Sequence, residues 1–166
     1  MIDPQKLLQD ITGFPIDDTA AERTYSLRLM QENAWTKEFT ARVVVEYKRF
    51  VFLSMVAGHH CVPSTFIDQA WHTHILYLHS YLFDFCHKVL GRMLWHTPSK
   101  GGRQEFDKHH ALYFQTLDSY QRWFGETPPA DIWGRCIAMR HHEGKTAGVV
   151  QPFTSEIAEL VLENGK

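Results

Sequence analysis

The sequence predicts an all-α protein: a single domain, residues 1–166, built as a bundle of long antiparallel helices around an aromatic core. First, 166 residues are the length of one domain. Second, apolar and aromatic side chains recur at spacings of three and four residues along most of the chain, as on the buried face of a helix. Third, strand signals are weak, since Val149 and Val150 form the only short candidate outside the helices.

Two helices are predicted in the first third of the chain, over residues 19–32 and 36–58. Leu27 and Met30 lie on one face of the first helix. The second helix is expected to be well buried, because its apolar face carries Phe39, Val43, Tyr47, Phe50 and Leu53.

A long third helix is predicted over residues 65–90. It begins after Pro63, where the hydroxyl of Ser64 or Thr65 can satisfy the free amides of the first turn. Residues 91–104 follow it as a loop, because they are rich in glycine and proline.

The last part of the chain predicts one more long helix, over residues 105–125, and then shorter elements. Residues 131–136 can form one further turn, residues 140–152 are a loop, and residues 155–162 form a short amphipathic helix. The apolar face of the long helix carries Tyr113, Leu117, Tyr120 and Phe124.

Composition excludes several classes of protein. Seventeen Lys and Arg against nineteen Asp and Glu leave no broad positive field for a nucleic acid backbone. The apolar runs are too short to span a bilayer, and residues 1–20 lack a basic and apolar leader, so we expect a cytoplasmic protein. Three cysteines without a CxxC spacing imply neither a disulfide framework nor a cysteine-based zinc site. Eleven histidines are the unusual feature and point to imidazole chemistry.

The most suggestive pair is Asp68 and His72, four residues apart on the predicted third helix. This spacing places the two side chains on one face, with Cβ atoms about 5–6 Å apart, which suits a shared metal ion. Two other interpretations stay open. Thr65-x-x-Asp68 also fits a capping box, in which the carboxylate bonds the Thr65 amide. His72 alone also fits a core histidine bonded to a carbonyl.

The neighbours of this pair are expected to play other parts. His74 points to the far side of a regular helix, so it cannot share the ion. His79 returns to the same stripe and is a reserve ligand or a member of a second site; otherwise both histidines are solvated or support the ligands. Trp71 is most simply a core anchor.

Four further groups offer a third ligand: His59–His60, His96, His109–His110 and His141–His142. Residues 72–91 rise about 28 Å if helical, whereas the five residues from Gly91 to His96 retrace at most roughly 17 Å. His96 therefore meets His72 only if the helix frays or ends early, near Cys86.

Two of the other groups are expected close to Asp68. His59 and His60 lie in the loop just before its helix, and His141 and His142 follow the last long helix. A solvated turn is the alternative for His141 and His142.

The helix over residues 105–125 is expected to run antiparallel to the helix that carries Asp68. Tyr120 would then lie near His72, and Tyr113 near His79. Their hydroxyls could donate to a developing oxyanion, or the two rings could be core aromatics with hydroxyls at the rim.

The chain resembles the glycine-rich domain-containing protein-like family over roughly residues 60–135. The hallmark is Asp68-x-x-Trp71-His72-x-His74-x-Leu76, followed by Tyr81, Cys86 and Gly91-Arg92. Similarity to bacterial members continues through Tyr113, Thr116-Leu117, Tyr120, Phe124-Gly125, Pro128-Pro129 and Asp131-Ile132-Trp133. In those members a histidine and a proline follow the glycine-arginine pair, here His96 and Pro98; relatives with paired histidines differ, since Trp95 precedes His96. The resemblance implies an intracellular helical domain with Asp68, His72 and His96 as its first candidates, but no particular reaction.

One carboxylate and two imidazoles suit catalytic zinc and also a non-haem iron site. We favour zinc over iron, and hence a metal-dependent hydrolase with an unknown small molecule or protein as partner, because no acid/base glutamate of the HExxH kind and no cofactor fingerprint is present. The alternatives are a non-catalytic helical interaction module, a closed structural metal site and a non-haem iron enzyme.

Overall fold

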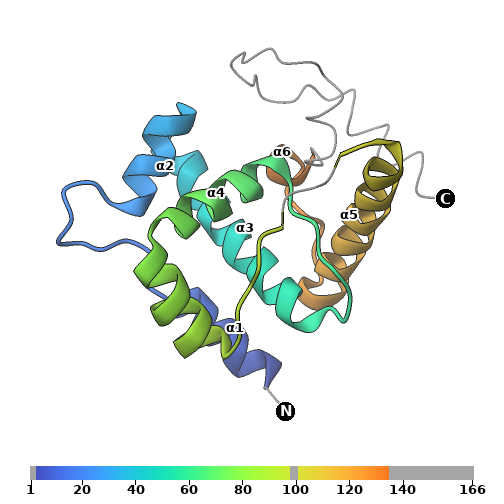
Figure 1. The fold of residues 1–166 in the computed structure, drawn as a ribbon, viewed down its shortest axis with the longest axis horizontal. Coiled ribbons are helices and arrows are strands. Elements are labelled where there is room, and N and C mark those ends of the chain that lie inside the picture. The colour runs from blue at the N-terminus through green and yellow to red at the C-terminus, as the bar shows by residue number, and fades with distance from the viewer. Residues whose placement is uncertain (1–2, 98–100, 135–166) are drawn as a thin grey trace.

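The computed structural model describes residues 3–97 and 101–134, and this part of the chain is all-α (Figure 1). Its helices are α1 (Pro4–Gly13), α2 (Tyr25–Asn33), α3 (Lys37–Val56), α4 (Thr65–Leu76), the π-helix η1 (Ser80–Leu90), α5 (Arg103–Phe124) and α6 (Ala130–Trp133). The predicted fold class is therefore confirmed. The loop over residues 140–152 and the helix over residues 155–162 lie outside the described residues.

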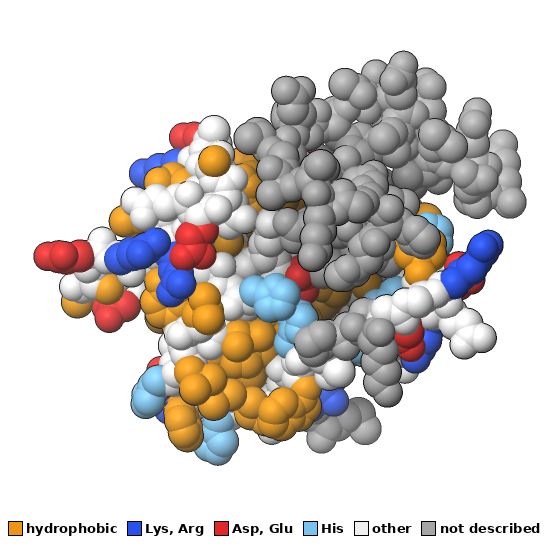
Figure 2. Space-filling view, turned by 45° about the horizontal axis from the view of Figure 1, so that its top comes forward, with side chains coloured by type: hydrophobic (Ala, Val, Ile, Leu, Met, Phe, Trp, Pro, Cys, Tyr) orange, Lys and Arg blue, Asp and Glu red, His pale blue; other side chains and the backbone are white. Residues whose placement is uncertain are grey.

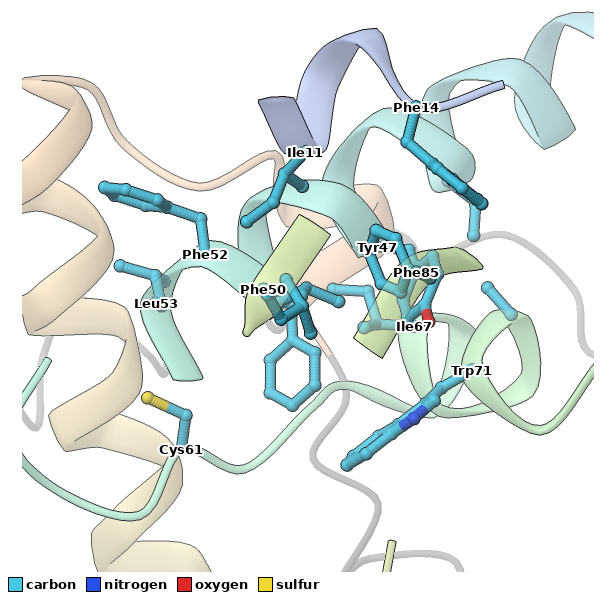
Figure 3. Packing of buried hydrophobic residues seen from close by; sticks show 14 of the residues in the cluster. Ile11, Phe14, Tyr47, Phe50, Phe52, Leu53, Cys61, Ile67, Trp71 and Phe85 are labelled. Atoms are coloured by element: carbon cyan, nitrogen blue, oxygen red, sulfur yellow. The ribbon is translucent and has the colours of Figure 1, made fainter. Parts of the chain in front are cut away.

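Helix α3 forms the centre of the molecule, and α1, α2, α4 and α5 all pack against it. Tyr47, Phe50 and Phe52 of α3 are almost fully buried. They belong to a cluster of aromatic and aliphatic side chains that also takes in Trp71 and Phe85 (Figure 3). The aromatic core predicted from the sequence is present.

Hydroxyl side chains fix where three of the helices begin. Thr24, Thr36 and Ser64 are the N-caps of α2, α3 and α4, and each accepts a hydrogen bond from the amide three residues on. The helix predicted over residues 19–32 therefore begins only at Tyr25, whereas α3 follows its prediction closely.

The first helix, α1, is absent from the sequence prediction. Asp3 caps it, and Pro4 occupies the first helical position, where a missing amide costs nothing. Leu7 and Ile11, four residues apart, are its buried residues. The sequence contains both the cap signal and the apolar pair of this helix, but two apolar positions form too short a pattern to predict a helix.

The prediction of one continuous helix over residues 65–90 is wrong. Helix α4 ends at Leu76, Tyr77 leaves helical geometry with φ −87° and ψ 61°, and η1 follows. His74 lies before this break and Tyr81 after it, and their rings pack with centroids 5.1 Å apart. This contact between two buried aromatic rings joins α4 and η1 across the interruption.

Helix α5 is joined to α3 through a buried carboxylate. Glu46 accepts hydrogen bonds from Tyr120 Oη at 3.2 Å and from Trp133 Nε1 of α6 at 2.8 Å. The hydroxyl of Tyr113 donates to the Trp133 carbonyl. Of the two interpretations left open for Tyr113 and Tyr120, the structure supports core aromatics, because both are buried and α5 packs against α3 and not, as expected, along α4.

None of the helices in the described ranges is both long and apolar enough to cross a bilayer.

Two of the cysteines are free and buried, and we expect both to resist thiol reagents in the native protein. Burial raises the pKa of the Cys61 thiol to about 11 and also raises the pKa of Cys86. Cys136 lies outside the described residues, so the measurement uses a Cys136→Ser variant. A disulfide reagent that releases a coloured product counts the thiols that react. Less than one thiol should react at neutral pH before urea is added, and two afterwards; rapid reaction of the folded protein would contradict the packing.

Candidate metal centre

The structure brings Asp68, His72 and His96 together. His72 Nδ1 lies 3.1 Å from Asp68 Oδ2, and His96 Nε2 lies 2.8 Å from Asp68 Oδ1. One ligand atom from each residue lies within 4.8 Å of the others, and this is the one such group of histidine, cysteine and acidic residues within residues 3–97 and 101–134. The three residues are those that the sequence singles out.

Helix α4 supplies two of the three side chains. Asp68 and His72 lie one turn apart, so they share a face. Ser64, not Thr65, caps the helix, and the two carboxylate oxygens of Asp68 point to the two imidazoles. The capping-box interpretation of Asp68 is thus replaced by contacts with both histidines.

His96 reaches the pair from the returning segment after η1. The early end of α4 removes the distance problem that a continuous helix would pose. The His96 ring lies with its centroid 4.6 Å from the Trp71 ring and 4.3 Å from the His72 ring. Arg92 holds the start of this segment by donating to the Ser54 carbonyl at 3.1 Å.

The donor set and spacing fit a small divalent cation. In a tetrahedral zinc site with bonds of about 2.1 Å, neighbouring ligand atoms are roughly 3.4 Å apart. The contacts of the two Asp68 oxygens with His72 and His96, at 3.1 and 2.8 Å, are close to this separation, and one ligand atom from each of the three residues lies within 4.8 Å of the others. The Asp68 side chain is 4% exposed but that of His72 is 54% exposed, so one side of the group is open to solvent.

His74 has a different role from the one predicted. It is neither solvated nor beside the ligands but buried among aromatic rings, with its Nδ1 2.9 Å from Tyr47 Oη. Burial lowers the pKa of His74 to about 3, because the charged imidazole would lose its hydration. Its Nε2 is buried without a hydrogen-bond partner among the described residues.

The other histidines lie elsewhere. His59 Nε2 is 2.8 Å from the hydroxyl of Ser119 on α5. Burial and the nearby His109 lower the pKa of His60. The expectation that His59 and His60 stand beside Asp68 is not met, because their loop lies against α5. His79 is exposed and lies 3.5 Å from Asp84.

Within the part of the chain that the structure describes, His109 and His110 are not members of the group. His109 Nε2 lies 3.3 Å from a carboxylate oxygen of Glu105 on its own helix, and His141 and His142 lie outside the described residues.

Sequence reasoning missed the hydrogen bonds of Tyr81 beside the site. Its hydroxyl accepts from Trp71 Nε1 at 2.8 Å and donates to the Leu94 carbonyl, two residues before His96. Trp71 was expected to be a core anchor, and it is buried. The only signal in the sequence was the polar end of each of these side chains, which needs a partner when buried.

Comparison with known proteins gives relatives but no solved structure, since none matches the chain. Glycine-rich domain-containing protein 1 of Arabidopsis thaliana is 29% identical over 126 residues, which cover 72% of this chain and 14% of that protein. Glycine-rich domain-containing protein 2 of the same plant is 31% identical over 94 residues, covering 52% of this chain and 12% of that protein. The chain thus spans a small part of the length of either relative.

A family model described as UCP032817-like matches residues 16–114. That range contains α2, α3, α4, η1, the whole candidate metal centre and the first half of α5. The relationship to glycine-rich domain-containing proteins inferred from the tryptophan-histidine motif is confirmed, and the chain belongs to the UCP032817-like family.

Proposed function

We propose that this protein binds one divalent transition-metal ion through Asp68, His72 and His96, and that the ion supports hydrolysis. The observation that carries the proposal is the buried carboxylate of Asp68 with an imidazole nitrogen at each of its two oxygens. Paired histidines and one carboxylate are a donor set of catalytic zinc sites.

The open side of the group favours a catalytic over a closed structural site. Structural zinc sites are usually closed by four protein ligands, whereas catalytic sites have three and keep a position for water or substrate. Three side chains that could hold an ion come together within the described ranges, and the exposed His72 marks the side from which a substrate would arrive.

We favour zinc over iron as the resident ion. Zinc accepts the tetrahedral geometry that three ligands and one open position provide, while the same ligands arranged on one face also suit non-haem Fe(II). A bound zinc ion would supply Lewis acidity toward a carbonyl or phosphoryl group. The carboxylate of Asp68 would offset part of the positive charge of the ion. The two imidazoles would position the ion beside the Trp71 ring.

We expect protein purified without a histidine tag to contain close to one equivalent of zinc by elemental analysis. Asp68→Ala, His72→Ala and His96→Ala should each lose most of it, and the exposed histidine variant His79→Ala is the matched control that should keep it. Metal at a thousand times its dissociation constant adds about 4 kcal/mol of stability, so a chelator should lower the melting temperature of the wild type and of His79→Ala but not that of the three variants that lose the metal.

The outcomes separate the alternatives. Stoichiometric iron would replace zinc in the proposal, and a spectrum showing four protein ligands would make the site structural. If neither purified nor metal-soaked protein holds an ion, metal binding is overturned.

A non-catalytic interaction module would then be the better interpretation, and one observation favours it. Large apolar side chains are exposed at the end of α4, between α4 and η1, on η1 and after it, namely Leu76, Leu78, Phe83 and Trp95. Figure 2 shows histidine side chains beside a hydrophobic patch on one face of the molecule. Such a patch is typical of a surface that contacts another protein.

A further inference from the structure

We propose that Tyr81 is a positioning residue of the metal centre, whose hydroxyl holds the segment that carries His96 so that the imidazole meets Asp68. This inference rests on the proposed function. It assigns to a buried tyrosine a part in ligand geometry, although its side chain is not one of the three that offer a ligand atom.

The hydroxyl of Tyr81 joins two elements that come from opposite ends of η1. Trp71 on α4 donates its indole N–H to Tyr81 Oη at 2.8 Å, and Tyr81 donates onward to the Leu94 carbonyl. Leu94 precedes His96 by two residues. One oxygen therefore connects the helix that supplies two ligands with the segment that supplies the third.

The hydrogen bonds of Tyr81 and the ring contact between Trp71 and His96 together form a closed network beside the site. Trp71 lies between Asp68 and His72 on α4, and its ring contacts that of His96 at a centroid distance of 4.6 Å. The indole ring thus limits where the imidazole can lie, while its N–H fixes the hydroxyl of Tyr81. Burial raises the pKa of Tyr81, so the phenol keeps its proton at neutral pH and remains a donor to the Leu94 carbonyl.

Packing and positioning can be separated at this residue. The ring of Tyr81 contacts the buried His74 ring, with centroids 5.1 Å apart, and phenylalanine would keep that contact. Tyr81→Phe removes only the oxygen that links Trp71 to Leu94. The Asp68 and His72 pair, which lies on α4 alone, would stay as it is.

The experiment measures Co²⁺ binding to the full chain by its visible absorption. Tyr81→Phe should bind about 10–100-fold more weakly than the wild type, as expected when a group that orients a ligand is removed, and its spectrum should shift toward that of His96→Ala. The control is Tyr25→Phe, which removes another buried hydroxyl bond to α4, at the Ala70 carbonyl, and should bind within twofold of the wild type.

A double-mutant cycle tests whether Tyr81 acts through His96. In the His96→Ala background, Tyr81→Phe should cause no further loss of affinity. An independent loss of the same size in both backgrounds would overturn the inference, as would a Tyr81→Phe protein with wild-type affinity and spectrum.

Failure of the proposed function would be recognised separately, because the wild type itself would then bind no Co²⁺. The positioning of His96 would still be decided in metal-free protein, by nuclear Overhauser contacts between the Trp71 and His96 rings. Loss of these contacts in Tyr81→Phe, with retention in Tyr25→Phe, supports the positioning role. Their persistence in Tyr81→Phe overturns it.

Discussion

Replacing Glu46 with alanine is expected to lower the free energy of unfolding by about 3–5 kcal/mol, as when one partner of a buried charged network is removed. Glu46 is 4% exposed and accepts from Trp133 Nε1 and Tyr120 Oη, while Arg49 lies 3.2 Å from the same oxygen as Tyr120. Truncation would leave the indole and phenol donors buried without this acceptor. Because these groups come from α3, α5 and α6, the loss should weaken the packing of the C-terminal helices.

Urea denaturation followed by circular dichroism would measure this effect. Glu46→Gln keeps the shape and an acceptor oxygen, so its loss of stability should be smaller than that of Glu46→Ala. Glu38→Ala, at an exposed position in the first turn of the same helix, is the control and should cost less than about 1 kcal/mol. If Glu46→Ala costs no more than this control, the network does not join the helices as described.

Acid is expected to destabilise the protein through His74. In the folded state burial holds the pKa of His74 down at about 3, whereas an exposed imidazole in the unfolded chain titrates near about 6.5. The unfolded state therefore binds the extra proton first as pH falls, and unfolding becomes easier. The contribution of His74 is fully present above about pH 6.5 and is lost toward pH 3, at up to about 1.4 kcal/mol per pH unit.

His74→Phe should remove this part of the pH dependence. The free energy of unfolding of the wild type, followed from pH 7 to pH 4.5, should fall more steeply than that of His74→Phe. His79→Ala, which changes an exposed histidine, should keep the wild-type slope. Parallel curves for wild type and His74→Phe would show that His74 accepts a proton in the folded protein.

The sequence predicted the parts of the fold that local signals determine. Cap hydroxyls and apolar spacing placed α3 and the start of α4 closely, because both act within one or two turns. The Asp68 and His72 pair followed from the same periodicity. His96 was selected by its place after the glycine-arginine pair. Chain geometry required a break in the preceding helix but placed it near Cys86, whereas the structure breaks at Tyr77 and η1 runs through Cys86 to Leu90.

What the sequence did not reveal depends on contacts between distant residues. The rings of Tyr81 and His74 pack on each other across the break at Tyr77. The sequence shows no sign of the break, because a regular helical pattern of apolar residues runs through that point. The docking of α5 on α3 depends on Glu46, which reads as an ordinary charged helix residue until its partners are known. His59 and His60 were placed near Asp68 only because they are close to it in the sequence. Closeness in sequence does not indicate which helix a loop packs against.

The early end of α4 also bears on the stability that an ion in the candidate metal centre would add. Asp68 and His96 stand at the two ends of an excursion that contains all of η1, a type of helix that rarely extends beyond one turn. An ion held by both residues would cross-link the two ends of this segment. Closing a loop of about thirty residues with a cross-link is worth roughly 3–4 kcal/mol in chain entropy. Occupancy of the site and integrity of the π-helix would then rise and fall together.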